Sequence, residues 1–260
     1  MARGVRAFKP KIGGDPDEDA ARLRAIREAV GPDVAIRADA NQGYRPKEAI
    51  RLCRLAERFD VSLELLEQPV AAWDLQGIAA VRRSVDTLIE ADESCYSIHD
   101  AMQVVRHEAA DVLNIKLGKA GGLSNAKKIA AIVEASGLRC VIGTAFGLGP
   151  EIAAKLHLAA STMTVVDAVE FTELRLHGNL LAPPHDELLA FPLTDGCLTV
   201  PWHGVPRAIP QRSGWLVTIQ QRMSPARKLR EYRQSLFAKT VRALKRSGVV
   251  RRTSTAWRHS

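Results

Sequence analysis

Short apolar runs alternate with amphipathic helical patterns along most of this chain. The apolar runs predict buried strands at Val5–Ile12, Val34–Ala38, Leu63–Leu66, Thr87–Ala91, Asp111–Ile115, Arg139–Gly143 and Val165–Phe171. The segments between them predict helices that begin near Asp15, Pro46, Leu75, Ile98, Gly122 and Pro150. Strands with so few polar positions are typical of a parallel sheet whose outside is covered by helices.

Two architectures fit this alternation, an open doubly wound sheet and a (β/α)8 barrel. An open sheet concentrates its functional residues at one switch point, whereas a barrel collects them from successive strand ends. Here polar phrases follow four successive strands: Asp39-Ala40-Asn41, Glu67-Gln68-Pro69, Asp92-Glu93-Ser94 and Asn114-Ile115-Lys116. We therefore predict the barrel.

Asp39, Glu67 and Asp92 each end a strand, and parallel strands bring such ends to one mouth. Carboxylate oxygens are the ligands that Mg2+ prefers, and no His or Cys accompanies them, which argues against zinc. An Asp at this position can also simply cap the following helix. Three acids in register on adjacent strands favour the metal site.

Lysines flank the predicted acid site. Lys9 and Lys11 are two residues apart on one strand and so point to the same face, and Lys116 ends the strand that follows Asp92. Neighbouring cations and burial lower the pKa of a lysine, which makes the amine a usable base. This combination predicts removal of a proton alpha to a carboxylate, with the metal stabilising the resulting enediolate.

The same phrases, with Lys9-Pro10-Lys11 before them and Gly121-Gly122 after them, resemble the mandelate racemase / muconate lactonizing enzyme family of the enolase superfamily. The likeness runs from about residue 5 to residue 201. Lysines on both sides of the acids resemble the muconate-lactonizing subgroup, because the mandelate racemase subgroup has an Asp–His pair at the positions of Lys116 and the following strand end. The resemblance implies a modified (β/α)7β TIM-type barrel.

The resemblance also implies residue roles. It makes Asp39, Glu67 and Asp92 ligands of Mg2+, or of Mn2+ in its place, and makes Lys11 and Lys116 the acid/base pair. Further roles follow for these residues: Lys9 tunes Lys11 or holds the substrate carboxylate, Glu170 is an acid of the last strand with Glu173 as the substitute, and Asn41 and Asn114 lie around the ligands. The implied substrate is a small carboxylic acid, and the outcome is cycloisomerisation, racemisation, epimerisation or dehydration.

The chain departs from the family pattern at both ends. Family members have an α+β capping domain and a first βα unit before the Lys-x-Lys strand, and we expect both to be missing here. The barrel would then have an open seam, or an edge filled by another element, and an unfilled edge strand pairs readily with another chain. We expect a barrel domain over residues 1–210, a partly helical or disordered tail over 211–260, and a homo-oligomer.

Charge separates these two parts. The whole chain has a formal net charge of +8, but residues 211–260 hold 13 Lys/Arg against one acid, and residues 1–210 hold 24 against 28. The predicted domain is mildly acidic, so no nucleic-acid binding is expected. No apolar run reaches the length of a membrane span, no signal peptide is visible, and the scattered cysteines suggest a reducing, cytoplasmic setting.

Two other functions remain open. The chain could be a truncated, weakly active or inactive relative that keeps the site residues. It could also be a binding protein that acts through an amphipathic basic helix predicted at Pro225–Ser247.

Overall fold

The computed structural model describes residues 6–145 and 149–169 and four later strand segments, 193–194, 197–202, 205–208 and 216–219. The helices are α1 Pro16–Val30, α2 Pro46–Arg58, α3 Leu75–Arg82, α4 Ile98–Arg106, α5 Leu117–Ala120, α6 Leu123–Ala135 and α7 Gly149–Ala160. The first seven strands are β1 Ala7–Pro10, β2 Ala35–Asp39, β3 Leu63–Glu67, β4 Leu88–Ala91, β5 Val112–Ile115, β6 Arg139–Ile142 and β7 Val165–Val169.

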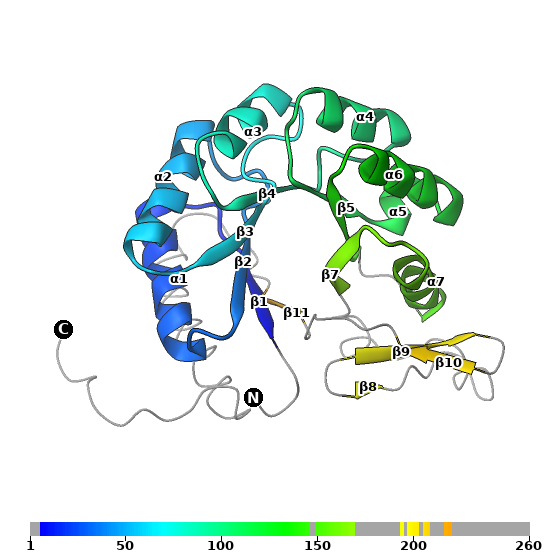
Figure 1. Cartoon of the computed structure of the whole chain (residues 1–260). Coiled ribbons are helices and arrows are strands. Elements are labelled where there is room, and N and C mark those ends of the chain that lie inside the picture. The colour runs from blue at the N-terminus through cyan, green and yellow to red at the C-terminus, as the bar shows by residue number, and fades with distance from the viewer. Residues whose placement is uncertain are drawn as a thin grey trace.

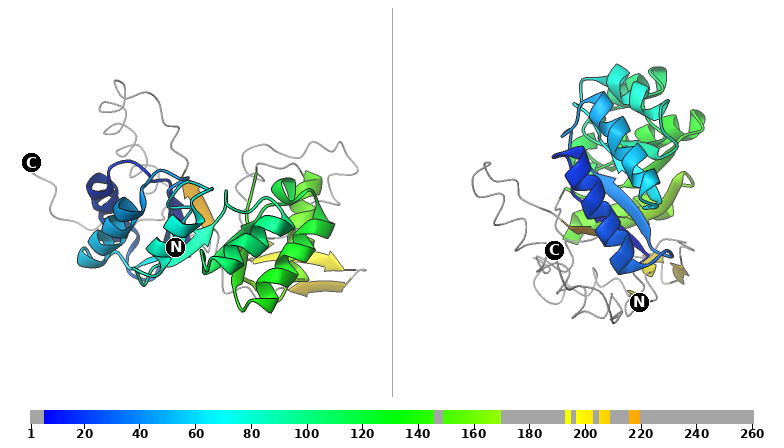
Figure 2. Two further views of the ribbon diagram at one scale, coloured as in Figure 1. Left: turned by 90° about the horizontal axis from the view of Figure 1, so that it is seen from above. Right: turned by 90° about the vertical axis from the view of Figure 1, so that its left-hand side faces the viewer.

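These strands form a parallel sheet that curls into part of a barrel, with the helices along its outside (Figure 1). Within the described residues the sheet has eight strands, in the order β11-β1-β2-β3-β4-β5-β6-β7. Figure 2 shows the helices beside the strands from above and from the side. The predicted barrel architecture is therefore confirmed as a curled half-barrel of parallel strands with an outer layer of helices.

Local signals place the helix ends where the sequence predicts them. Asp15 caps α1, because its side chain accepts hydrogen bonds from the backbone N–H groups of Asp17 and Glu18. Gly31 follows the same helix with a left-handed φ of 83°. The short helix α5 was not predicted, and it lies between Lys116 and the left-handed Gly121.

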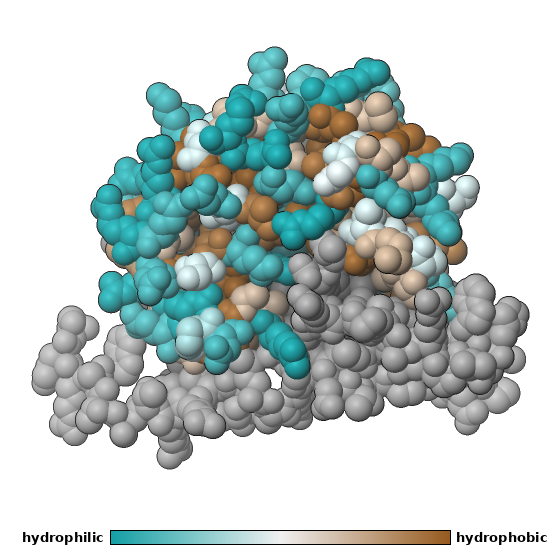
Figure 3. All heavy atoms as spheres, viewed as in Figure 1, coloured by the Kyte–Doolittle hydropathy of each residue, from teal (hydrophilic) through white to brown (hydrophobic). Residues whose placement is uncertain are grey.

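Side chains alternate between the two faces of the strands, as the period of two requires. Phe8, Ile36, Leu66, Ile89 and Leu113 are all buried in the main hydrophobic core with apolar side chains of the helices. A second, small apolar cluster lies on the alternate positions and consists of Leu65, Val112 and Val141. The outside of the helical layer is largely hydrophilic (Figure 3).

Two findings concern the later part of the chain. Strands β8 Leu193–Thr194, β9 Cys197–Trp202 and β10 Val205–Ala208 form a small antiparallel sheet. Strand β11, Leu216–Ile219, pairs in parallel with β1, with Ala7 opposite Leu216 and Pro10 opposite Ile219. Of the two alternatives for this edge, the structure has the filled one, with a strand from the predicted tail paired to β1. The helix predicted at 225–247 lies outside the described residues.

Candidate active site at the carboxyl ends of the strands

Three buried acids stand in a row at one end of the sheet. Asp39 is the last residue of β2, Glu67 is the last residue of β3, and Asp92 directly follows β4. Asp39 and Glu67 are opposite each other in the strand register. Their exposed fractions are 1%, 1% and 2%, so all three acids are buried at the same end of the sheet.

Each acid of this row is ion-paired to a lysine. Lys11 contacts Asp39, Lys9 contacts Glu67, and Lys116 contacts Asp92. The bases follow the order of the strands, since Lys11 comes from the β1 side of the row and Lys116 from the β5 side. The amines therefore flank the acids on two sides, and Lys9 reaches the middle acid.

Two further charged residues join this cluster and were not singled out from the sequence. Lys119 contacts the carboxylate of Asp92, lies 2.5 Å from its backbone oxygen, and sits 5.1 Å above the centre of the Tyr96 ring. Glu90 is 1% exposed, and its Oε2 is 3.9 Å from Nζ of Lys9. A signal existed for each: Lys119 is one helical turn from Lys116, and Glu90 interrupts an apolar strand.

The lysines set the charge state of Asp92. Burial acts to raise the pKa of this carboxyl, but the nearby ammonium groups of Lys116 and Lys119 outweigh burial, so the pKa lies below its ordinary value of 3.8. Asp92 is therefore ionised at neutral pH. In the same loop, burial raises the pKa of the Cys95 thiol to about 11, so this thiol is not a nucleophile at neutral pH.

The two asparagines differ in how they meet the acids. Asn114 is completely buried, and its Nδ2 donates to Oε1 of Glu67 at 3.1 Å. Asn41 donates its backbone N–H to Asp39 at 2.9 Å, while its side chain donates to Glu93 at 3.0 Å. Asn114 thus orients an acid through its side chain. The predicted Glu170 and its substitute Glu173 lie outside the described residues.

The donor atoms of the three acids are of the kind that a hard divalent cation binds. Asp39, Glu67 and Asp92 offer only oxygen donors, and the buried Oδ1 of Asn114 beside them has no hydrogen-bond partner. Their carboxylates point at lysines rather than at one another, and in the described part of the chain no three His, Cys, Asp or Glu residues converge closely enough to hold a metal. The residues present fit Mg2+ by type and strand position.

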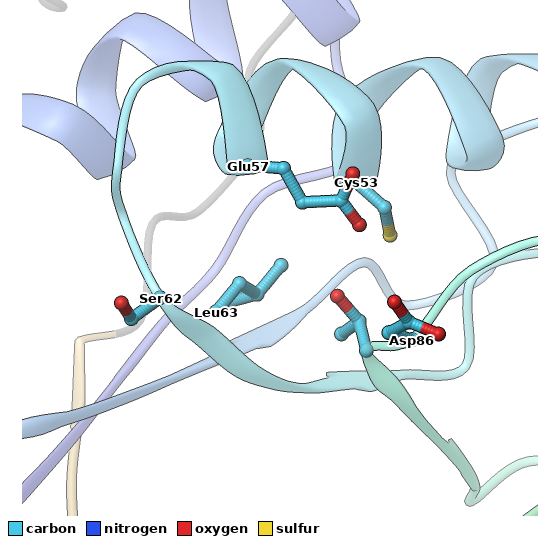
Figure 4. Close-up of a pocket in the computed structure, with 6 residues that line it drawn as sticks. Cys53, Glu57, Ser62, Leu63 and Asp86 are labelled. Atoms are coloured by element: carbon cyan, nitrogen blue, oxygen red, sulfur yellow. The ribbon is translucent and has the colours of Figure 1, made fainter.

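A cavity of about 220 Å³ lies at the opposite end of the strands (Figure 4). It is lined by residues at the starts of β3 and β4 and on α2: Cys53, Glu57, Ser62, Leu63, Asp86 and Thr87. Burial raises the pKa of the Cys53 thiol to about 12, which leaves this thiol protonated and unreactive at neutral pH. Because the cavity lies at the starts of the strands, it is separate from the acid row at their carboxyl ends.

A curled parallel sheet with a row of acids and flanking lysines at its carboxyl ends defines the barrel domain of the enolase superfamily. The sequence profile of the family described as Enolase C-terminal domain-like matches residues 1–222. The chain belongs to this family, which confirms the resemblance to the mandelate racemase / muconate lactonizing enzymes. No helix among the described residues is long and apolar enough to cross a membrane.

Characterised relatives are similar over the same region. The L-Ala-D/L-Glu epimerase of Clostridium acetobutylicum is 40% identical over 183 residues, which are 70% of this chain and 49% of that protein. The L-Ala-D/L-Glu epimerase of Bacillus subtilis is 43% identical over 166 residues, 64% of this chain and 45% of that protein. The chain thus spans about half the length of the curated relatives it matches.

Solved structures agree with this assignment. A substrate-liganded complex of the Bacillus subtilis L-Ala-D/L-Glu epimerase has a TM-score of 0.63 at 42% identity and covers 65% of this chain and 47% of its own. The dipeptide epimerase of Enterococcus faecalis, complexed with Mg and the dipeptide L-Leu-L-Tyr, has a TM-score of 0.61 at 42% identity, with 63% and 46% covered.

Proposed function

We propose that this chain carries the catalytic residues of an isomerase that removes and returns a proton alpha to a carboxylate. The observation that carries the proposal is the order Lys11, Asp39, Glu67, Asp92, Lys116 along the sheet, with amines on both sides of the acids. An acid/base group on each face of one carbon can invert its configuration by removing a proton from one face and returning one to the other. The similar dipeptide epimerases support this outcome over cycloisomerisation and dehydration.

Asp39, Glu67 and Asp92 are the proposed ligands of Mg2+, with Mn2+ as the alternative ion. When bound, the cation would stabilise the negative charge that develops on the substrate carboxylate as the alpha proton leaves. The chain's own residues neutralise and orient the middle acid: Lys9 is ion-paired to Glu67, and Asn114 donates a hydrogen bond to the same carboxylate.

The two outer lysines move the protons. One of Lys11 and Lys116, in its amine form, takes the alpha proton from one face of the carbon. The other, in its ammonium form, gives a proton to the opposite face, so the configuration inverts and the proton count is unchanged. Glu170 is proposed as a further acid of the site. The proposed substrate is a small carboxylate of the amino-acid or dipeptide class.

The test is alpha-proton exchange in D2O, followed by NMR, with the intact chain, Mg2+ and both epimers of a dipeptide panel. The wild type is expected to incorporate deuterium into both epimers. Lys116→Ala and Lys11→Ala are each expected to lose exchange of one epimer, opposite in the two variants. Lys127→Ala on the exposed face of α6 is the matched control and should behave as the wild type.

Binding of the cation is measured separately, by the shift of the melting temperature with Mg2+. A shift in the wild type that disappears in Asp39→Asn supports the proposed ligands. A shift without any proton exchange would support the inactive-relative alternative, and exchange of both epimers in both lysine variants would refute the two-base assignment.

A further inference from the structure

Gln68 connects the loops that carry two of the three acids. It directly follows Glu67, is completely buried, and has a left-handed φ of 37°. Its Oε1 accepts from the backbone N–H of Asp92 at 2.9 Å and from that of Ser94 at 3.1 Å. Its Nε2 donates to the Val70 carbonyl at 3.0 Å and to Ser94 Oγ at 2.8 Å. Both acceptor lone pairs and both donors of the amide are thereby used.

The hydrogen bonds continue on both sides of this amide. Ser94 Oγ donates to the Ala72 carbonyl at 2.9 Å, which returns the network to the loop after β3. The backbone N–H of Gln68 donates to the Glu90 carbonyl at 2.8 Å, extending the contact between β3 and β4. A buried polar network with every member satisfied is rigid, and it specifies one arrangement of the segments that it joins.

We propose that Gln68 is a positioning residue that holds the Asp92 loop at a fixed place relative to Glu67. The backbone of Asp92 is held directly by the Gln68 side chain, and Glu67 is its neighbour in the chain. The separation of the two carboxylates therefore depends on one amide that touches neither carboxylate. The expected effect on Mg2+ binding rests on the proposed function, whereas the hydrogen bonds of Gln68 do not depend on it.

The consequence is measured as Mg2+ affinity of the intact chain by titration calorimetry. Loss of a group that orients a ligand typically lowers metal affinity about 10- to 100-fold, and Gln68→Leu is expected to raise the Kd for Mg2+ by that factor. The matched control is Gln42→Leu. The Gln42 amide, in the loop after β2, accepts from the backbone N–H of Ala72 at 2.9 Å. Its loss loosens the loop after β3 but leaves all four hydrogen bonds of the Gln68 side chain in place, and the Kd is expected to stay unchanged.

Ser94→Ala keeps the inference testable if Gln68→Leu does not fold. It removes one partner of the amide and leaves both backbone donors to Oε1 in place. We expect a smaller rise in Kd, of about 3- to 10-fold, and recovery in Ser94→Thr, which keeps the hydroxyl. A folded Gln68→Leu or Ser94→Ala variant with the wild-type Kd overturns the inference.

Hydrogen exchange separates this inference from the proposed function. The amide hydrogens of Asp92 and Ser94 are expected to exchange faster in Gln68→Leu, which removes their acceptor, than in Gln42→Leu, with or without Mg2+. Ser94→Ala, which frees the amide from one partner, is expected to show a smaller increase. A wild type that binds no Mg2+ contradicts the proposed function alone, and faster exchange at these two amides then still supports the positioning role. Unchanged exchange at both amides overturns it.

Discussion

Lys9 lies between two buried carboxylates, which adds a counter-ion role to those that its sequence position suggests. It contacts Glu67, and its Nζ is 3.9 Å from Glu90. All three side chains are at most 2% exposed. Buried carboxylates are costly unless a counter-charge accompanies them. Lys9 therefore supplies the counter-charge of Glu67, and its predicted roles of tuning Lys11 or holding substrate stay predictions.

Replacing Lys9 tests this counter-ion role. Lys9→Met leaves Glu67 and Glu90 buried without the cation they share, so the free energy of unfolding is expected to fall by about 3 kcal/mol or more. Glu90→Gln leaves the Lys9–Glu67 pair in place, and a smaller loss of about 1 kcal/mol is expected. Urea unfolding of both variants measures the two values. Equal losses, or a Lys9→Met variant as stable as the wild type, would contradict the assignment.

The lowered pKa of Asp92 predicts a pH dependence with a definite sign. Because the folded pKa is below the unfolded one, the carboxylate stabilises the protein fully above a pH of about 4, and this contribution is lost as the pH falls through the folded pKa. With a chelator present to remove metal ions, the free energy of unfolding of Asp92→Asn at pH 7 is expected to be about 3 kcal/mol lower than that of the wild type. The difference should be smaller at pH 3.

Asp33, an exposed acid, provides the comparison for this measurement. Urea unfolding of Asp33→Asn is expected to follow the wild type at both pH values, since surface charges contribute little. A difference between Asp92→Asn and the wild type that stays constant from pH 7 to pH 3 would show that the Lys116 and Lys119 contacts do not act through the ionised carboxylate.

At the scale of elements, Gly143 directly follows β6 and packs against the end of β5, where its backbone N–H donates to the Ile115 carbonyl at 3.0 Å. A Cβ on Gly143 would overlap the Asn114 side chain and lie 2.8 Å from Cε of Lys116. Gly143→Ala must therefore displace both side chains, and overpacking of this kind costs about 1–3 kcal/mol. Denaturant unfolding should show this loss, and the displaced Asn114 should weaken the orientation of Glu67.

Gly118 is the matched control for this substitution. It lies in α5, and nothing is within 4 Å of the position of its Cβ. Gly118→Ala is expected to leave the stability unchanged or to raise it by up to about 1 kcal/mol, because alanine favours the helix. Equal destabilisation by both substitutions would rule out steric overlap at Gly143 as the cause.

The elements and the acid row could be predicted because both depend on local order. Strand Val34–Ala38 was expected and β2 is Ala35–Asp39; strand Leu63–Leu66 was expected and β3 is Leu63–Glu67. The strands extend one residue further because Asp39 and Glu67 themselves pair in the ladder. A polar residue that ends an apolar run in successive parallel strands must lie at the same end of the sheet.

Other contacts could not be predicted because they depend on which side chains meet across elements. Glu90 precedes the Asp92 phrase inside an apolar strand, and only the packed structure shows that Lys9 is its neighbour. Gln68 was part of a predicted phrase, but its four hydrogen bonds depend on the conformation of the next loop. The roles proposed for Lys11, Lys116 and Glu170 stay predictions until exchange is measured.

At the scale of the whole molecule, the curled sheet has two ends, and β11 covers the one at β1. The sequence did not predict this strand, because a four-residue run with three apolar side chains in a basic segment carries no signal for its partner. Unpaired edge strands promote association between chains. The β1–β11 pairing therefore links the later part of the chain to the oligomeric state, and the predicted homo-oligomer stays a prediction.

Proline substitution of β11 tests this link. Neighbouring backbone N–H groups point to opposite sides of a strand, so replacing both Val217 and Thr218 with proline removes at least one donor that faces β1. The double variant should expose the β1 edge and associate more strongly with rising concentration than the wild type, as measured by sedimentation velocity. Val217→Ile combined with Thr218→Val keeps the strand and should match the wild type. If the proline variant also matches the wild type in association and in thermal stability, then β11 does not protect the edge. The β1 strand must in that case be shielded by its own short length or by Pro10, which offers no backbone donor.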